Sequence, residues 1–210
     1  MKLVIFDFDG TIIDTETAWY YIYRDVLQHE YQFKLELEHF LKIVGTTDDM
    51  LFDFLDKSMS NTLDRVLFNQ QIEKHFSLHR KNLSLREGVI ELIEKLTESG
   101  VQLAIASSST KEWVMGFLEE YNLFSHFSTV KTKDDVKMVK PDPSLYLEVL
   151  KDHSITPKDA VAIEDSVYGS LAAIRAGIKC IVVPNMITKT LNFPEEVTHF
   201  DSFMDVNLFK

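Results

Sequence analysis

The sequence contains one cysteine, Cys180, in 210 residues, which excludes an internal disulfide and leaves no cysteine pattern for a zinc site. No apolar run reaches the roughly 18–20 residues that a membrane-spanning helix needs. Residues 1–6 resemble the start of a signal peptide, but Asp7 and Asp9 end its apolar part too early. Internal repeats and low-complexity tracts are also absent. These absences predict a soluble, cytoplasmic protein.

Basic residues are scarce relative to acidic ones. There are 22 lysines and arginines against 33 aspartates and glutamates, which gives a formal net charge of −11. A negative surface repels nucleic acid and anionic lipid, so we expect neither nucleic acid nor membrane as a partner. Hydrophobic residues make up 45% of the chain, which excludes general disorder. Nothing specifies an oligomeric state, so a monomer is the default expectation.

Short apolar runs alternate with amphipathic segments over most of the chain. The first run, Leu3–Phe6, is continuous and short, as in a strand buried on both faces. After residue 85 the pattern predicts strands at 101–106, 127–130, 160–163, 178–183 and 198–200, separated by helices at 87–99, 110–121, 143–153 and 167–176. This alternation predicts an α/β fold, with a parallel sheet covered by helices on both faces.

Residues 14–84 have a different pattern. Aromatic and leucine residues recur there at helical spacing, for example at Trp19, Tyr23 and Leu55, and no strand is indicated. We expect about four helices in this segment, with Trp19, Tyr20 and Tyr23 mainly in its own core. The chain is therefore predicted to consist of a core (1–13 and 85–210) and an inserted all-helical domain (14–84).

Residues with reactive side chains follow four of the predicted strands. Asp7 and Asp9 come after the first strand, Ser107 and Ser108 after the second, and Glu164-Asp165 after the fourth; Lys140 lies in the loop that follows the third. Ligands of open parallel sheets bind beyond the carboxyl ends of the strands, so we expect these side chains to meet at one edge.

Clustered carboxylates repel one another unless a cation lies among them. Hard oxygen ligands suit Mg²⁺, and hydroxyls with backbone N–H groups at a helix N-terminus suit phosphate, so the set predicts metal-assisted phosphoryl transfer. Asp7 is the candidate nucleophile, and Asp9 the acid that protonates the leaving oxygen and later accepts a proton from water. Ser107, Ser108 and Lys140 are the candidate phosphate-binding residues. Lys140 can neutralise either a phosphate oxygen or the Asp7 carboxylate.

Each of these signals has a plainer explanation when taken alone. The serines at 107–109 resemble an ordinary helix N-cap, and Lys140 lies near other lysines that suit the surface. Asp7 and Asp9 do not fit a calcium loop, whose glycine comes at its sixth position rather than its fourth. The order and combination of the clusters favour a catalytic site over these alternatives.

The four clusters resemble the motifs of the haloacid dehalogenase superfamily. Asp7-Phe8-Asp9-Gly10-Thr11 is similar to its first motif, the serines after Ala106 to its second, Lys140-Pro141 to its third and Glu164-Asp165-Ser166 to its fourth; Asp14-Thr15-Glu16 is similar to a stretch common after the first. The resemblance implies a Rossmann-like core, Mg²⁺, and Asp7 as nucleophile. It implies Asp7, the Asp9 carbonyl and Asp165 as metal ligands, with Glu164 close to the ion through water.

A helical insertion between the first two motifs resembles the β-phosphoglucomutase-like branch with a small helical cap. Sugar-phosphate mutases of that branch typically carry a histidine and an arginine where this chain has Trp19 and Asp48, and an anionic Asp48 would repel a second phosphate. We therefore expect a Mg²⁺-dependent phosphatase of a small phosphorylated metabolite, such as a sugar phosphate. A sugar-phosphate mutase and a non-catalytic phosphoacceptor domain are the alternatives.

Overall fold

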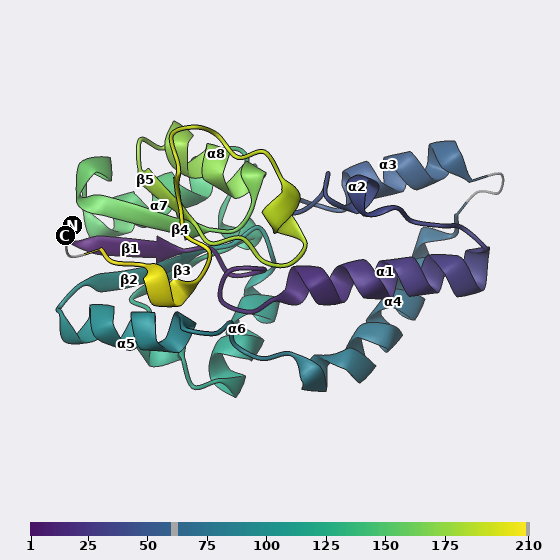
Figure 1. Cartoon of the computed structure of the whole chain (residues 1–210), viewed down its shortest axis with the longest axis horizontal. Helices are drawn as coiled ribbons and strands as arrows, with labels where there is room; N and C mark the ends of the chain where they lie inside the picture. The colour runs from purple at the N-terminus through teal and green to yellow at the C-terminus, as the bar shows by residue number, and fades with distance from the viewer. Residues whose placement is uncertain (60–62, 209–210) are drawn as a thin grey trace.

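A computed structural model describes residues 1–59 and 63–208 of the chain. Its sheet has six parallel strands in the order β3-β2-β1-β4-β5-β6 (Figure 1). The strands are β1 (Leu3–Phe6), β2 (Gln102–Ala106), β3 (Thr129–Lys131), β4 (Ala160–Glu164), β5 (Lys179–Val182) and β6 (Thr198–His199). The chain crosses over between β3 and β4, so β1 lies between β2 and β4. The predicted α/β fold is confirmed.

Helices cover both faces of this sheet. They are α5 (Val89–Glu98), α6 (Lys111–Glu120), α7 (Ser144–His153) and α8 (Val167–Arg175). The side chains of β1 alternate between two hydrophobic cores: Val4 and Phe6 belong to the core that includes α5 and α6, and Leu3 and Ile5 to the core that includes α7 and α8. All four residues are fully buried, as their continuous apolar pattern predicts.

A helical segment is inserted between β1 and α5 and extends away from the sheet (Figure 1). It contains α1 (Thr15–Tyr31), α2 (Leu37–Phe40), α3 (Asp49–Ser58) and α4 (Arg65–His79). Aromatic side chains hold it together; for example, the ring of Tyr23 lies 5.9 Å from that of Phe68 and 6.0 Å from that of Phe40. The all-helical insertion is therefore confirmed, and its division from the core at residues 14 and 84 stays a prediction.

The predicted boundaries differ from the observed ones where side-chain burial overrides local pattern. A strand was expected at 127–130, but β3 spans Thr129–Lys131, which pairs with Ala104–Ala106 of β2. Phe127 instead follows a 3₁₀ turn and packs edge-on against Phe6, with ring centroids 6.0 Å apart. The other short 3₁₀ helices are 80–82, 133–135, 157–159, 188–190 and 203–205. Phe127 therefore has the sequence pattern of a strand residue, although it packs against the sheet from the preceding turn.

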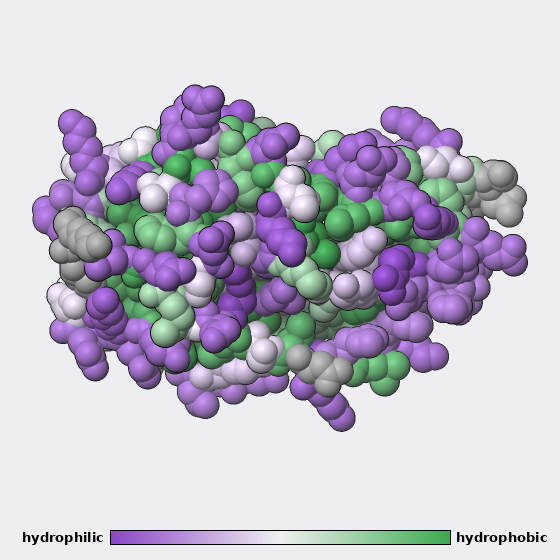
Figure 2. All heavy atoms as spheres, viewed as in Figure 1, coloured by the Kyte–Doolittle hydropathy of each residue, from purple (hydrophilic) through white to green (hydrophobic). Residues whose placement is uncertain are grey.

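The face of the molecule drawn in Figure 2 carries many charged and polar side chains. In the view of Figure 2 hydrophilic side chains cover most of the face, with smaller apolar areas between them. In the part of the chain that is described, every helix is too short or too polar to cross a lipid bilayer. The predicted cytoplasmic location stays a prediction.

Gly169 and Gly116 are both helical glycines, and a pair of alanine substitutions tests how closely α8 packs on the sheet. A Cβ at Gly169 would lie 2.0 Å from the Glu164 carboxylate, whereas the nearest atom to a Cβ at Gly116 is 3.7 Å away. Gly169→Ala should lower the free energy of unfolding by about 1–3 kcal/mol through overpacking. Gly116→Ala should raise it by about 0.5–1 kcal/mol because alanine loses less entropy in a helix. Urea denaturation measures both, and two changes of the same sign would contradict this packing.

Candidate active site

The carboxyl ends of β1, β2 and β4 place the predicted site residues at one edge of the sheet. Because β1 pairs with both β2 and β4, Asp7 lies between the chain segments that carry Ser107 and Asp165. Lys140 reaches the same place from the loop before α7. The structure brings these four clusters together, as the sequence predicts.

Lys140 is at the centre of the buried part of the site. Its side chain is 1% exposed, and its Nζ lies 2.5 Å from Asp7 Oδ1 and 2.7 Å from Glu164 Oε1. Burial acts to lower the pKa of this ammonium, but the carboxylates of Asp7 and Glu164 raise it overall. The lysine therefore stays charged. In this structure it contacts Asp7, which is one of the two roles left open by the sequence.

The two carboxyl groups that contact this ammonium belong to a cluster of three. Asp7, Glu164 and Asp165 each offer an oxygen within 4.8 Å of the others, and all three are buried. Burial raises the pKa of Asp7 to about 7, with Lys140 opposing and Glu164 adding to the rise. Burial, then Asp7 and Glu164, raise the pKa of Asp165 well above its usual range. More negative charge is collected here than one ammonium compensates, and a divalent cation with oxygen ligands fits this donor set.

The loops around Asp165 fix its carboxylate. Thr11 Oγ1 donates to one carboxylate oxygen at 3.2 Å and Asn185 Nδ2 to the other at 2.8 Å. Gly10 has φ +80°, and a Cβ there would lie 2.3 Å from Asp165 Oδ2, so both the turn and the close approach require glycine. Arg86 anchors the same region from the other side, because its guanidinium donates to the carbonyl oxygens of Gly10, Val183 and Pro184.

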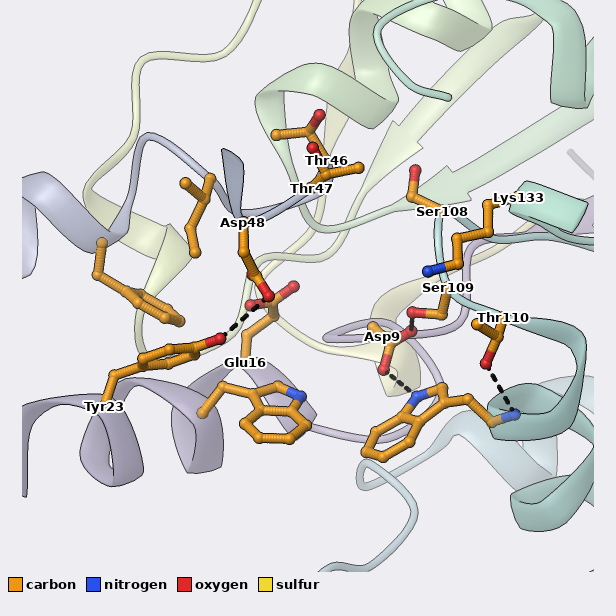
Figure 3. Close-up of a pocket in the computed structure, with 14 residues that line it drawn as sticks. Asp9, Glu16, Tyr23, Thr46, Thr47, Asp48, Ser108, Ser109, Thr110 and Lys133 are labelled. Carbon is orange, nitrogen blue, oxygen red and sulfur yellow. Dashed lines mark hydrogen bonds between the residues drawn. The ribbon is translucent and has the colours of Figure 1, made fainter. Parts of the chain in front are cut away.

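Asp9 lies apart from these carboxylates and borders a cavity (Figure 3). Its Oδ1 accepts hydrogen bonds from Thr15 Oγ1 and Trp113 Nε1, each at 2.8 Å, and its Oδ2 accepts one from Ser109 Oγ at 2.7 Å. The donors come from α1, α6 and the loop after β2. Asp9 is therefore oriented by both the insertion and the core, at the boundary between the acidic cluster and the open space.

The two predicted phosphate-binding serines have different surroundings. Ser107 is buried, and its Oγ accepts a hydrogen bond from the Ser109 backbone N–H at 3.0 Å. Ser108 borders the cavity and its Oγ donates to the carbonyl oxygen of Gly45 in the insertion at 3.1 Å. Gly45 itself lies so close to the core that a Cβ would be 2.4 Å from Ser166 Oγ. Their role in binding phosphate stays a prediction.

The cavity between core and insertion measures about 280 Å³. Core residues 9, 108–110, 113 and 133 and insertion residues 16, 19, 23, 40, 43 and 46–48 line it. Trp19, Tyr20 and Tyr23 are expected mainly in the core of the insertion, and they pack there: Trp19 stacks on Phe76 at 4.2 Å, and Tyr20 and Tyr23 lie against Phe40. Trp19 and Tyr23 also border the cavity.

The sequence assigns no role to five residues near Asp9, although Thr15, Glu16 and Ser109 lie within the motifs quoted above. Thr15, Ser109 and Trp113 bind Asp9, while Glu16 and Lys133 line the space beside it. Ser109 lies in the same loop as Ser107, and Trp113 lies in the first turn of α6, which follows that loop. Both could therefore have been found from the sequence. Lys133 has no local signal that separates it from neighbouring surface lysines.

Comparison with known proteins gives the family. The model of the haloacid dehalogenase-like hydrolases matches residues 4–183, so the chain belongs to that family. It is 36% identical over 209 residues to a Bacillus subtilis protein named "Putative phosphatase YhcW", covering 99% of this chain and 94% of that one. It is 32% identical to the phosphorylated carbohydrates phosphatase of Thermotoga maritima over 86% of this chain and 84% of that one.

A solved structure supports the same assignment. CbbY from Rhodobacter sphaeroides in complex with phosphate matches with a TM-score of 0.81 and 25% sequence identity, covering 98% of this chain and 96% of that one. The predicted family and hydrolase class are confirmed. The individual roles of Asp7, Asp9, Ser107, Ser108, Lys140 and Asp165 stay predictions.

The raised pKa of Asp7 predicts a pH-dependent cost in the metal-free protein. A carboxyl with a folded pKa of about 7 and an unfolded value of 3.8 binds more protons when folded, so it reduces stability as pH rises through this interval. Asp7→Asn removes that cost. In EDTA, the difference in unfolding free energy, variant minus wild type, should increase between pH 4 and 7 by up to about 1.4 kcal/mol per pH unit. A difference that stays flat or falls would contradict the direction of this shift.

Proposed function

We propose that this chain is a Mg²⁺-dependent phosphatase that hydrolyses a small phosphorylated metabolite, a sugar phosphate in particular, through an aspartyl-phosphate on Asp7. The observation that carries the proposal is the buried contact of Lys140 with Asp7 and Glu164, with Asp165 close by and Asp9 at the adjoining cavity. Several relatives bear phosphatase names, which supports the reaction type.

Asp7, Asp165 and the main-chain carbonyl of Asp9 are the groups that would hold Mg²⁺, with Glu164 next to them. The bound ion would supply positive charge that reduces the repulsion between the Asp7 carboxylate and an incoming phosphate. Lys140 contributes a second fixed positive charge from the buried side. Since Lys140 occupies Asp7 Oδ1, the other carboxylate oxygen, Oδ2, is assigned as the attacking atom.

In the first step, Asp7 Oδ2 forms a bond to phosphorus while the bond from phosphorus to the leaving oxygen breaks. Asp9, in its protonated form, transfers its proton to that oxygen, and a neutral alcohol departs. The hydrogen bonds from Thr15, Ser109 and Trp113 hold the Asp9 side chain beside the cavity in which the alcohol would lie. Ser107 and Ser108 would bind the oxygens of the transferred group.

In the second step, water attacks the phosphorus of the aspartyl-phosphate, and the bond between phosphorus and Asp7 Oδ2 breaks. The Asp9 carboxylate takes the proton of the attacking water, which restores its acid form. Inorganic phosphate leaves and Asp7 is a carboxylate again. Asp9 thus acts as the acid in the first step and as the base in the second. Over both steps Asp7 and Asp9 return to their starting protonation states.

Two features bear on the choice between phosphatase and mutase. The relatives include a phosphorylated carbohydrates phosphatase and hexitol phosphatase B of Escherichia coli, which supports a sugar or polyol phosphate as the substrate. A mutase must also hold the second phosphate of a bisphosphate intermediate. Among described residues that line the cavity, Lys133 is the only basic one. We therefore favour hydrolysis, in a cytoplasmic protein without nucleic-acid or membrane partners.

Replacing the nucleophile tests the phosphatase mechanism. Asp7→Asn should reduce Mg²⁺-dependent hydrolysis of p-nitrophenyl phosphate by roughly 10³-fold or more, because an amide cannot form the aspartyl-phosphate. EDTA should abolish activity and added Mg²⁺ should restore it. Asp25→Asn, which changes an exposed carboxylate on α1, is the matched control and should keep wild-type turnover. Substantial turnover by Asp7→Asn would overturn the mechanism.

A product assay separates the two enzyme alternatives. With β-glucose 1-phosphate and Mg²⁺, a phosphatase releases inorganic phosphate in proportion to substrate consumed, because water is the final acceptor. A mutase instead yields glucose 6-phosphate with little free phosphate. We expect phosphate release, measured colorimetrically alongside a coupled assay for glucose 6-phosphate. Accumulation of glucose 6-phosphate without phosphate would favour the mutase.

A further inference from the structure

The cavity next to Asp9 has an uneven distribution of charge. Three of its lining residues are acidic: Asp9, Glu16 and Asp48. Among the described residues that line it, Lys133 is the one basic residue, and it is exposed. In Figure 3 Lys133 is drawn on the side of Ser109 and Thr110, while Glu16 and Asp48 are drawn on the side of Tyr23. The part of the cavity that would hold the alcohol portion of a substrate is therefore lined by carboxyl groups.

Glu16 is a half-buried carboxyl without a hydrogen-bond donor in the protein. No side chain or backbone N–H within residues 1–59 and 63–208 donates to it, and no basic group there lies within ion-pair distance. Burial, followed by the negative charges of Asp165 and Asp9, raises its pKa. Glu16 lines the cavity together with Asp9 and Asp48, so its carboxyl is available to a donor on a ligand.

Asp48 is the second acceptor on this wall. It lies at the start of α3, and its Oδ2 accepts a hydrogen bond from Tyr23 OH at 3.0 Å. No described arginine, lysine or histidine forms an ion pair with it. A carboxylate has room for about four hydrogen bonds, so Asp48 retains capacity for donors on a substrate.

Aromatic rings form another part of the wall. The rings of Trp19 and Trp113 lie 5.6 Å apart, one from the insertion and one from the core, and Phe40 and Tyr23 border the same space. Such faces pack against the C–H surfaces of a compact polyol or sugar and interact favourably with a cationic amine. A second anion would meet carboxylates and ring faces, both of which disfavour it.

We infer, on the basis of the phosphatase activity proposed above, that Glu16 and Asp48 select phosphate monoesters whose alcohol portion carries hydroxyl or amino donors and no second anionic group. Bisphosphates and phosphorylated acids are excluded by repulsion. The accepted substrates present their donors to the two carboxyl groups while their phosphate lies at the Asp9 end of the cavity. This makes Glu16 and Asp48 specificity-determining residues of the site.

Three related esters test this selection: glucosamine 6-phosphate, glucose 6-phosphate and 6-phosphogluconate, which carry an added positive, neutral or negative group. For the wild type, kcat/KM for 6-phosphogluconate should be at least about tenfold below that for each of the other two. At a pH at which Glu16 and Asp48 are both ionised, Glu16→Gln and Asp48→Asn should each bring kcat/KM for 6-phosphogluconate about tenfold closer to the values for the other two esters. Each substitution then removes one like charge a few ångströms away in a partly solvated site. The better of the two accepted esters shows whether amino or hydroxyl donors are preferred.

Controls separate this inference from the phosphatase proposal. Asp53→Asn changes an exposed carboxylate on α3, the helix that Asp48 caps, but Asp53 does not line the cavity. It should leave the relative kcat/KM values of the three esters unchanged. Hydrolysis of p-nitrophenyl phosphate reports the phosphatase activity independently. If that hydrolysis occurs but 6-phosphogluconate is accepted as well as the others, or if Glu16→Gln and Asp48→Asn do not change the ratios, the selection is overturned and the phosphatase stands.

A binding measurement completes the test. In Asp7→Asn with Mg²⁺, where turnover is blocked, glucosamine 6-phosphate and glucose 6-phosphate should raise the melting temperature more than 6-phosphogluconate does. Equal shifts from all three esters, or no shift from the two predicted ligands, would overturn the inference.

Discussion

The ammonium of Lys140, buried between Asp7 and Glu164, is the interaction on which the rest of the site depends. Together with Arg86, which acts on Asp165, it offsets the negative charge of three carboxyl groups whose oxygens lie within 4.8 Å of one another. Tyr146 OH donates to the same Glu164 oxygen at 2.7 Å, and Gly169 allows α8 to pass directly over this carboxylate. The close packing of α7 and α8 on the sheet therefore also serves to hold the charged residues in place.

The sheet and the insertion contribute different parts of the site. The ends of β1 and β4 provide the fixed acidic cluster, which the parallel strand order brings together. The insertion provides Glu16, Trp19, Tyr23 and Asp48, which line the space beyond Asp9. Asp9 accepts hydrogen bonds from both parts: from Thr15 of the insertion, and from Ser109 and Trp113 of the core. Asp9 is thus the carboxylate at which the acidic cluster of the core and the cavity-lining residues of the insertion meet.

The sequence predicted the features that follow from short-range pattern and strand order. A buried first strand, alternating helices and strands, and reactive residues after each strand were enough to place Asp7, Lys140 and Asp165 together. The cavity could not be predicted in the same way, because the inward face of α1 depends on how the insertion packs against the core. Glu16 lies only seven residues after Asp9, yet its exposure to the cavity follows from tertiary contacts that no local periodicity encodes.

Gly45 sets how closely the insertion approaches the core. Its backbone lies against Ser166, and its carbonyl accepts a hydrogen bond from Ser108. The absence of a side chain there lets the segment between α2 and α3 lie directly against the loop after β2 and the start of α8. A methyl group at residue 45 would collide with Ser166 and push the insertion away from the core.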